Sequence, residues 1–339
     1  MDIKIYKEKI KELLANTSIS KNNIFEYDFS EYKDEFDEVF SFYQENLINN
    51  SKYGITPSVI FFNNNLTVNA KAGKDNSYYI ISINMGTIVK LIEMFKEKTD
   101  LLDEENNKDF LEFEAFLDIP INNLMYQNAF HFTFYHEMAH LIQKSEFLEN
   151  NLYEHLDNSN DFSERRHLLE LDADEFSSIS IGSHIIQYSE KMFGDDLTDE
   201  QFENLLVIAC SSVFLYLLSF PSNIRKIHYD RFSHPHPVIR VLSIIFAIVS
   251  YCIESLQSKG TDITLNSKET VNKTFEFSKS LSESFFEGSN PISEFQESLE
   301  EEGLCILDYL TKYQNLKIND RTLAVYKWNQ MVTKIKKSQ

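Results

Sequence analysis

The chain has 339 residues, of which 42% are hydrophobic and 14% aromatic, enough apolar side chains for one large or two moderate cores. Its 53 acidic and 32 basic residues give a formal net charge of -21, which argues against nucleic acid or an anionic membrane surface as a partner held by overall charge. The 3 cysteines are far apart and form no Cys-x-x-Cys pair, which predicts a reducing, cytoplasmic location and no cysteine zinc site.

The first 50 residues are charged and rich in phenylalanine. We expect one or two helices in this N-terminal segment, 1–50, and no export by a standard signal, because the opening residues lack an apolar core. From residue 56 the pattern changes to short runs of aromatic and β-branched residues. The runs at 57–62, 66–70 and 78–84 predict three strands of a small sheet, and we expect 78–84 to be the edge strand to which an extended substrate adds.

The rest of the chain is predicted to be helical, with polar loops at 100–108 and 150–161. The expected helices are 85–98, a long helix that begins near 119–122, then 163–192, 199–220, 238–256, 268–286, 293–312 and 321–336. The predicted fold is therefore α+β and predominantly helical, with a small mixed sheet and helical additions at both ends. Residues 51–256 are expected to form the main domain and 257–339 a C-terminal helical segment.

Two apolar runs, 205–220 and 241–253, resemble membrane spans. Both are shorter than the roughly 20 residues that cross a bilayer, and serines interrupt them. We expect them to be buried helices of a soluble protein that has no membrane partner. The alternative is a helical hairpin in a membrane.

His136 and His140 belong to a His-Glu-x-x-His pattern in the long helix. Residues four apart lie one turn away from each other on the same face, so the two imidazoles can bind one metal ion. Glu137 projects beside that pair and can contact a metal-bound water without being a ligand, which makes it the candidate general base. The alternative is a pair of hydrogen-bonded core histidines with Glu137 at the rim of the helix.

The residues around this pattern, 130–142, are mostly apolar and aromatic, so we expect the helix to lie in the core. Buried His and Glu side chains are costly unless a partner such as a divalent cation satisfies them. A catalytic zinc site also needs a third protein ligand and an open fourth position, so the interpretation depends on finding that ligand elsewhere.

The next long helix offers the third ligand. One small, acidic stripe at positions i, i+3, i+4 and i+7 consists of Glu170, Ala173, Asp174 and Ser177. Its small residues would let another helix approach closely. Glu170 can then ligate the ion, and Asp174 can accept the N–H of a ligand imidazole. The alternatives are a solvated acidic face, or Asp174 or His167 as the ligand in place of Glu170.

A Ser-His-Pro-His-Pro segment precedes a later helix. Its prolines fix the chain direction, so His234 is expected in an extended turn where it can donate to the oxyanion of a tetrahedral intermediate, a role worth about 3 to 4 kcal/mol. Arg240 and Tyr229 are further candidates for that role. The alternative is that His234 caps the helix and Arg240 pairs with Asp174 or Asp172.

Three segments in this order resemble the gluzincin metallopeptidases of the M48-like families. They are His136-Glu137-x-x-His140, Glu170-x-x-Ala173-Asp174, and Ser233-His234-Pro235 with Arg240. The resemblance implies a zincin-like core, zinc held by His136, His140 and Glu170, a supporting contact from Asp174, and His234 and Arg240 at the border of the active site. The soluble arrangement and the extra helices also resemble the Lit family of phage-exclusion proteases (peptidase family U49), cytosolic zinc enzymes that attack a host translation factor.

The predicted function is hydrolysis of peptide bonds in a cytosolic protein substrate, with one zinc ion per chain and Glu137 as general base. The resemblance adds phage exclusion, a form of antiviral defence, as the biological role. Two other functions stay open. One is a metal-binding regulatory protein without proteolysis, and the other is an integral membrane protease built on the two apolar runs.

Overall fold

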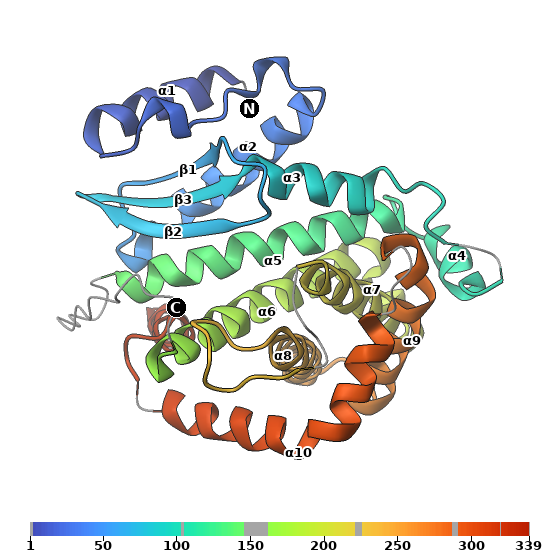
Figure 1. The fold of residues 1–339 in the computed structure, drawn as a ribbon. Helices are drawn as coiled ribbons and strands as arrows, with labels where there is room; N and C mark the ends of the chain where they lie inside the picture. Colours follow the sequence, from blue (N-terminus) through green and yellow to red (C-terminus); the bar gives the residue numbers. More distant parts are fainter. Residues whose placement is uncertain are drawn as a thin grey trace. The chain divides into compact units, whose positions relative to one another are not determined.

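A computed structural model describes residues 3–102, 105–145, 162–220, 226–286, 291–318 and 320–338. Contacts between residues divide the chain into two compact units. Unit 1 consists of Met1–Lys90, Thr133–Asp157 and Asn319–Gln339, and unit 2 of Leu91–Phe132 and Asn158–Ile318. Helix α5 (Ile121–Lys144) is unbroken, and its two halves belong to different units (Figure 1).

Unit 1 contains a three-stranded mixed sheet of strands β1 (Ser58–Asn63), β2 (Ala70–Asp75) and β3 (Tyr78–Asn84). The order is β1-β3-β2, with β3 parallel to β1 and antiparallel to β2 (Figure 1). The prediction that residues 78–84 form the edge strand is therefore wrong, because β3 is central. Its nearly continuous apolar run suits a strand that is covered on both sides.

Strand β2 begins where the predicted strand 66–70 ends, so that prediction is also wrong in position. The hairpin turn sets the pairing: Asn76 has a positive φ of 52°, and the register places Lys74 opposite Tyr79. Asparagine tolerates this left-handed conformation better than most residues. The sequence of β2 is Ala-Lys-Ala-Gly-Lys-Asp, which contains no β-branched or aromatic residue. Pairing with β3, and not the composition of β2, therefore defines β2 as a strand.

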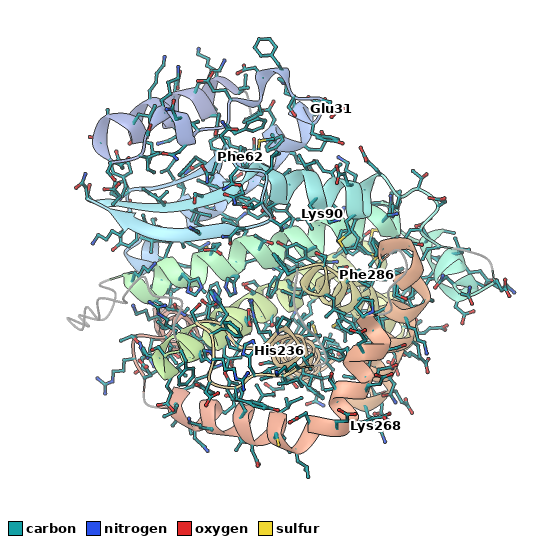
Figure 2. All side chains as sticks on the ribbon, viewed as in Figure 1. Glu31, Phe62, Lys90, His236, Lys268 and Phe286 are labelled. Atoms are coloured by element: carbon teal, nitrogen blue, oxygen red, sulfur yellow. The ribbon has the colours of Figure 1, made fainter. Side chains whose placement is uncertain are left out.

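Aromatic side chains form the core of unit 1. Helices α1 (Ile3–Asn16) and α2 (Lys33–Asn49) pack against β1. The ring of Phe62 on β1 (labelled in Figure 2) lies 4.9 Å from the ring of Phe36 and 5.6 Å from that of Tyr6, measured between centroids. All three side chains are fully buried, so they bring α1 and α2 onto the sheet. Short 3-10 turns join these elements: Lys21–Asn23, Tyr27–Phe29 and Ser51–Tyr53.

A buried lysine binds backbone carbonyl oxygens at the C-terminal end of α5 in the same unit. Lys327 lies on α11 (Ala324–Ser338) and is fully buried. Its Nζ donates to the carbonyl oxygens of Ile142 and Ser145 at 2.8 and 2.9 Å. The last carbonyls of a helix have no partner within it, and an ammonium group there also opposes the negative end of the helix dipole. Helix α11 therefore holds the end of α5 in place.

Unit 2 is helical in its described residues. It contains α4 (Lys108–Glu114), α6 (Glu164–Phe193), α7 (Asp199–Leu218), α8 (Pro237–Lys259), α9 (Ser267–Phe285) and α10 (Pro291–Lys317), besides the first half of α5. Helix α3 (Met85–Leu91) leads from β3 into a π-helical turn, Ile92–Lys96. Helix α8 packs against α6, α7, α9 and α10. A Cβ added to Gly182 of α6 would lie 2.6 Å from the Tyr251 ring, so this glycine lets α6 and α8 approach closely.

Helix starts in unit 2 follow local capping signals. The Ser163 side chain accepts from the backbone N–H of Arg166 at 3.4 Å, which agrees with the predicted start of α6. Thr198 and Gln201 form a reciprocal capping box at the start of α7. These contacts satisfy backbone donors that have no partner inside the helix.

Two helices are long and apolar enough to cross a membrane by length and composition, α7 and α8. Each is longer than the apolar run from which it was predicted. In α7, 89% of the apolar window is buried inside the protein, and in α8, 50%. Core helices of soluble proteins pass the same test, so the two helices are weak support for a membrane span.

The predicted fold class is confirmed: the chain is α+β, predominantly helical, with a small mixed sheet. The predicted helices are present, with ends that differ by a few residues. The polar loop predicted at 150–161 lies outside the described residues. The predicted domain limits after residues 50 and 256 stay predictions.

Candidate metal centre

Two imidazoles on α5 face each other. The Nε2 atoms of His136 and His140 are 3.2 Å apart, and the ring planes are nearly perpendicular at 88°. Two nitrogens bound tetrahedrally to zinc at about 2.0–2.1 Å would be about 3.3 Å apart. The observed separation therefore fits a shared ion. It also fits a hydrogen bond in which one ring nitrogen donates to the other, which was the alternative interpretation.

Gln143 fixes the orientation of one of these rings. Its side-chain Oε1 lies 2.9 Å from Nδ1 of His140. An amide oxygen only accepts, so Nδ1 carries the proton and the lone pair of Nε2 points towards His136. This is the support that metal-binding histidines commonly receive from a second residue. Gln143 is not among the site residues predicted from the sequence, although its position three residues after His140 is a signal for such a contact on a helix.

Glu137 is almost wholly buried, like its neighbour. The exposed fraction of both His136 and Glu137 is 8%. A carboxylate at such a position loses much of its hydration, and a proton or a cation nearby offsets that cost. Glu137 is therefore a buried carboxylate directly after His136, and its role as general base stays a prediction.

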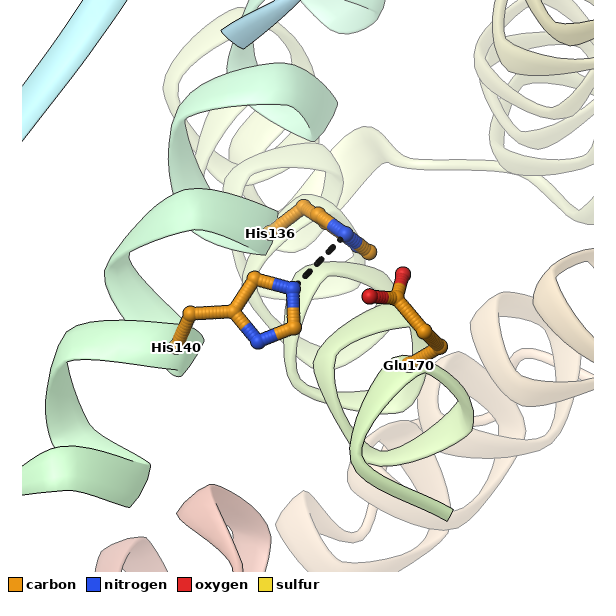
Figure 3. Close-up of side chains that lie close together, drawn as sticks. All are labelled: His136, His140 and Glu170. Atoms are coloured by element: carbon orange, nitrogen blue, oxygen red, sulfur yellow. Dashed lines mark hydrogen bonds between the residues drawn. The ribbon is translucent and has the colours of Figure 1, made fainter. Parts of the chain in front are cut away.

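The third predicted ligand completes a compact group. One ligand atom from each of His136, His140 and Glu170 lies within 4.8 Å of the other two. Figure 3 shows the Glu170 side chain of α6 pointing towards the two imidazoles of α5. Among the described residues, this is the one group of three or more His, Cys, Asp or Glu side chains placed to hold a metal ion. Two imidazole nitrogens and a carboxylate oxygen are a donor set that suits zinc and leaves one tetrahedral position for water. The residues present therefore fit the ion, whose binding stays a prediction.

The acidic stripe on α6 is buried. Ala173, Asp174 and Ser177 have no exposed surface, and the side chain of Glu170 is 13% exposed. The alternative of a solvated acidic face is therefore wrong for this stripe. Ser177 donates to the carbonyl oxygen of Phe132 at 3.3 Å, so within unit 2 the stripe lies directly against α5. Small side chains allow this approach.

Asp174 forms a two-point ion pair with Arg240. Arg240 donates through Nε and Nη2 to the two carboxylate oxygens, at 2.8 and 2.7 Å. Asp174 is fully buried and the side chain of Arg240 is 17% exposed, so the pair is largely desolvated. This is the alternative that the sequence analysis gave for Arg240. The expected contact of Asp174 with a ligand imidazole stays a prediction.

His234 lies beside the carboxylate of Glu170. Its Nε2 is 3.4 Å from Glu170 Oε1, its Nδ1 is 2.9 Å from the Ser233 hydroxyl, and its side chain is 60% exposed. The helix cap is a different residue: Nδ1 of His236 accepts from the backbone N–H of Val238 at 3.2 Å, at the start of α8 (Figure 2). The alternative that His234 caps this helix is therefore wrong.

The substitute candidates are engaged elsewhere. Both ring nitrogens of buried His167 have partners: Nδ1 is 2.5 Å from the Tyr309 hydroxyl, and Nε2 donates to the Phe232 carbonyl at 2.7 Å. Burial lowers the pKa of His167, which keeps the ring neutral in these contacts. The Tyr229 hydroxyl donates to Glu302 of α10 at 3.2 Å. His167 is thus a core residue, and Tyr229 contacts another helix.

No family model, no curated protein and no solved structure matches this chain. The arrangement of its own residues therefore carries the functional interpretation.

Proposed function

We propose that the protein is a zinc-dependent endopeptidase. One observation carries the proposal: two imidazoles four residues apart and a carboxylate from a different helix have ligand atoms within 4.8 Å of one another. A glutamate stands directly after the first histidine on a buried helix. A closed structural site would have four protein ligands, whereas three leave room for water, as hydrolysis requires.

The residues have separate tasks in this proposal. Bound zinc would lower the pKa of a water molecule and polarise the scissile carbonyl. Glu137 would act as the general base, taking a proton from the attacking water and returning it to the leaving amine, a contribution of about 10²–10⁴ in rate for general acid–base groups. His136, His140 and Glu170 hold the site, and Gln143 keeps His140 in the required tautomer.

His234 and Arg240 take different roles. The exposed imidazole of His234 lies next to Glu170 and can donate to an oxyanion that forms near the metal. Both carboxylate oxygens of Asp174 accept from Arg240, one turn beyond Glu170, so Arg240 positions α6 and is not itself assigned to the oxyanion. This assignment changes the sequence prediction, which placed the two residues in one group.

The substrate segment is proposed to add to β2, because β3 has neighbours on both sides. Edge strands bind extended peptides through main-chain hydrogen bonds. Lys144 at the end of α5 donates to the Ala72 carbonyl of β2 at 2.7 Å, so within unit 1 this strand passes close to the helix that carries both histidines. We propose a cytoplasmic protein as substrate and phage exclusion as the biological role, both from the resemblance.

A comparison of the parent with Glu137→Gln tests the proposal. We expect purified parent and variant to contain about one zinc per chain by elemental analysis, because Glu137 is not a ligand. Mass spectrometry of host proteins after induction should reveal new cleavage products with the parent only. Glu200→Gln, an exposed change at the start of α7, is the matched control and should behave as the parent.

Three results would redirect the interpretation. Zinc in the protein without cleavage by the parent would favour the regulatory metal-binding alternative. Cleavage that persists in Glu137→Gln would remove the general-base role. Recovery of the expressed protein only with detergent would favour the membrane protease, since α7 and α8 have the length and composition of spans.

A further inference from the structure

The outer edge of β1 is closed by side chains and by a neighbouring segment. The Gln44 side chain donates to the carbonyl of Ser58 and accepts from the N–H of Ile60, at 3.2 and 3.1 Å. The N–H of Phe62 donates to the Tyr6 hydroxyl, and the Phe62 carbonyl accepts from the N–H of Phe25. These contacts engage the outward-facing residues Ser58, Ile60 and Phe62 inside unit 1, and a peptide that adds to β1 would displace them.

The other edge of the sheet is β2. The N–H of Asn84 donates to the carbonyl of Asn69 across the hairpin, so residues 69, 71, 73 and 75 direct their backbone groups towards β3. The alternate residues Ala70, Ala72 and Lys74 direct theirs away from the sheet. A Cβ added to Gly73 would meet no atom within 4 Å, so the space on its face of the strand is open among the described residues.

Lys144 occupies the middle of this outward edge. Its Nζ donates to the Ala72 carbonyl at 2.7 Å, and its own residue is exposed. Lysine is a side chain that natural sheets place at edges to prevent unwanted strand pairing. Lys144 also follows His140 by four residues on the unbroken helix α5, about 6 Å along the axis. The residue that covers the edge is therefore one helical turn from a predicted zinc ligand.

The charge at this edge is opposite to that of the whole chain. Lys71 and Lys74 are exposed on β2 and join Lys144, while the carboxylate of Asp75 accepts from both the N–H and the hydroxyl of Ser18. Among the described residues, a chain with a net charge of -21 thus presents three lysines along the edge of β2 that lies next to α5. Local positive charge on a negative protein selects among partners by their charge.

We infer that β2 receives an extended, acidic segment of the substrate, and that Lys144 leaves the Ala72 carbonyl to pair with a carboxylate of that segment. This inference rests on the proposed function and names its substrate class. On binding, the Ala72 carbonyl exchanges an ammonium donor for a peptide N–H, and Lys144 exchanges the carbonyl for a carboxylate. Every polar group keeps a partner, so the exchange costs little. A carboxylate in the substrate segment also adds an attraction to the positive charge of Lys144 that an apolar or basic side chain at the same place does not offer.

Binding of short fluorescent peptides tests this inference without any cleavage. The protein is Glu137→Gln with zinc added, and the probes are two peptides of equal length, alternating Glu with Val or Lys with Val. Fluorescence anisotropy should show tighter binding of the glutamate peptide, although the net charge of the chain favours the lysine peptide. Lys144→Met should reduce this preference by up to about fivefold, the loss expected for one partly exposed charge pair. Lys144→Arg should retain it.

Two further variants separate charge from strand pairing. Ala72→Pro removes an outward N–H without removing a bond to β3, so it should weaken binding of both peptides. Lys11→Met changes an exposed lysine on α1 and should leave binding unchanged. Three outcomes with the Glu137→Gln protein that carries no further change would overturn the inference. They are equal binding of the two peptides, preference for the lysine peptide, and no binding of the glutamate peptide. Because cleavage is not measured, a failure of the peptidase proposal would appear separately, in the assays with active parent.

Discussion

Helices α5 and α6 both contribute to the candidate metal centre, but the contacts that support their site residues differ in how far apart the partners lie in the sequence. On α5 the chemistry is local: His136, Glu137 and His140 lie within five residues, and the contact from Gln143 to His140 spans one turn. On α6 it depends on distant segments. Asp174 is held by Arg240, 66 positions away in the sequence, and His167 contacts Tyr309, 142 positions away.

This difference predicts whether a substitution in the site first affects metal binding or the stability of the fold. A short local pattern needs only a helix to bring its side chains together, because helical geometry fixes their spacing. A carboxylate on α6 reaches its position only when buried contacts hold that helix in the folded unit. We therefore expect substitutions on α5 to affect metal and activity before stability, and substitutions around α6 to affect stability first.

The largest predicted effect concerns the buried pair on α6. Asp174→Asn leaves Arg240 without its charged partner in a buried position, which should lower the free energy of unfolding by about 3–5 kcal/mol in urea titration. The matched control is the exposed pair Glu190–Lys259, which joins the same helices α6 and α8. Glu190→Gln should cost less than about 1 kcal/mol. Similar losses for the two variants would show that the buried Asp174–Arg240 pair is no more important for stability than the exposed Glu190–Lys259 pair.

A second prediction compares a ligand from each helix. His140→Ala and Glu170→Ala should each weaken zinc binding by more than the roughly 10–100-fold that is lost when a supporting residue is removed. Competition with a chromophoric chelator measures both affinities. If Glu170→Ala binds zinc with the affinity of the parent, Glu170 is not a ligand. That result would favour the alternative in which His136 and His140 are hydrogen-bonded core histidines.

The contrast between local contacts on α5 and distant contacts of α6 also explains which features of the fold and the site could be predicted from the sequence. The pattern at 136–140 and the stripe at 170–177 predicted three ligand residues that the structure brings within 4.8 Å. The fold class followed from helical periodicity. Strand β2 was misplaced because Ala, Lys, Gly and Asp carry no strand signal, and only the pairing with β3 defines it. The central place of β3 and the choice of His236 over His234 as the cap depend on tertiary contacts that no local pattern contains.

The smallest predicted effect in zinc binding concerns Gln143, whose contact with His140 lies within α5. Gln143→Met removes the acceptor for Nδ1–H of His140, so the ring can adopt the other tautomer and present a protonated Nε2 to the site. Zinc affinity should fall by about 10–100-fold, with little change in the free energy of unfolding, because the contact spans a single helical turn. Gln187→Met, at an exposed position of α6, is the control and should change neither quantity. A loss of stability in Gln143→Met as large as that in Asp174→Asn would contradict the distinction between the local contact that supports His140 on α5 and the distant contact that holds Asp174 on α6.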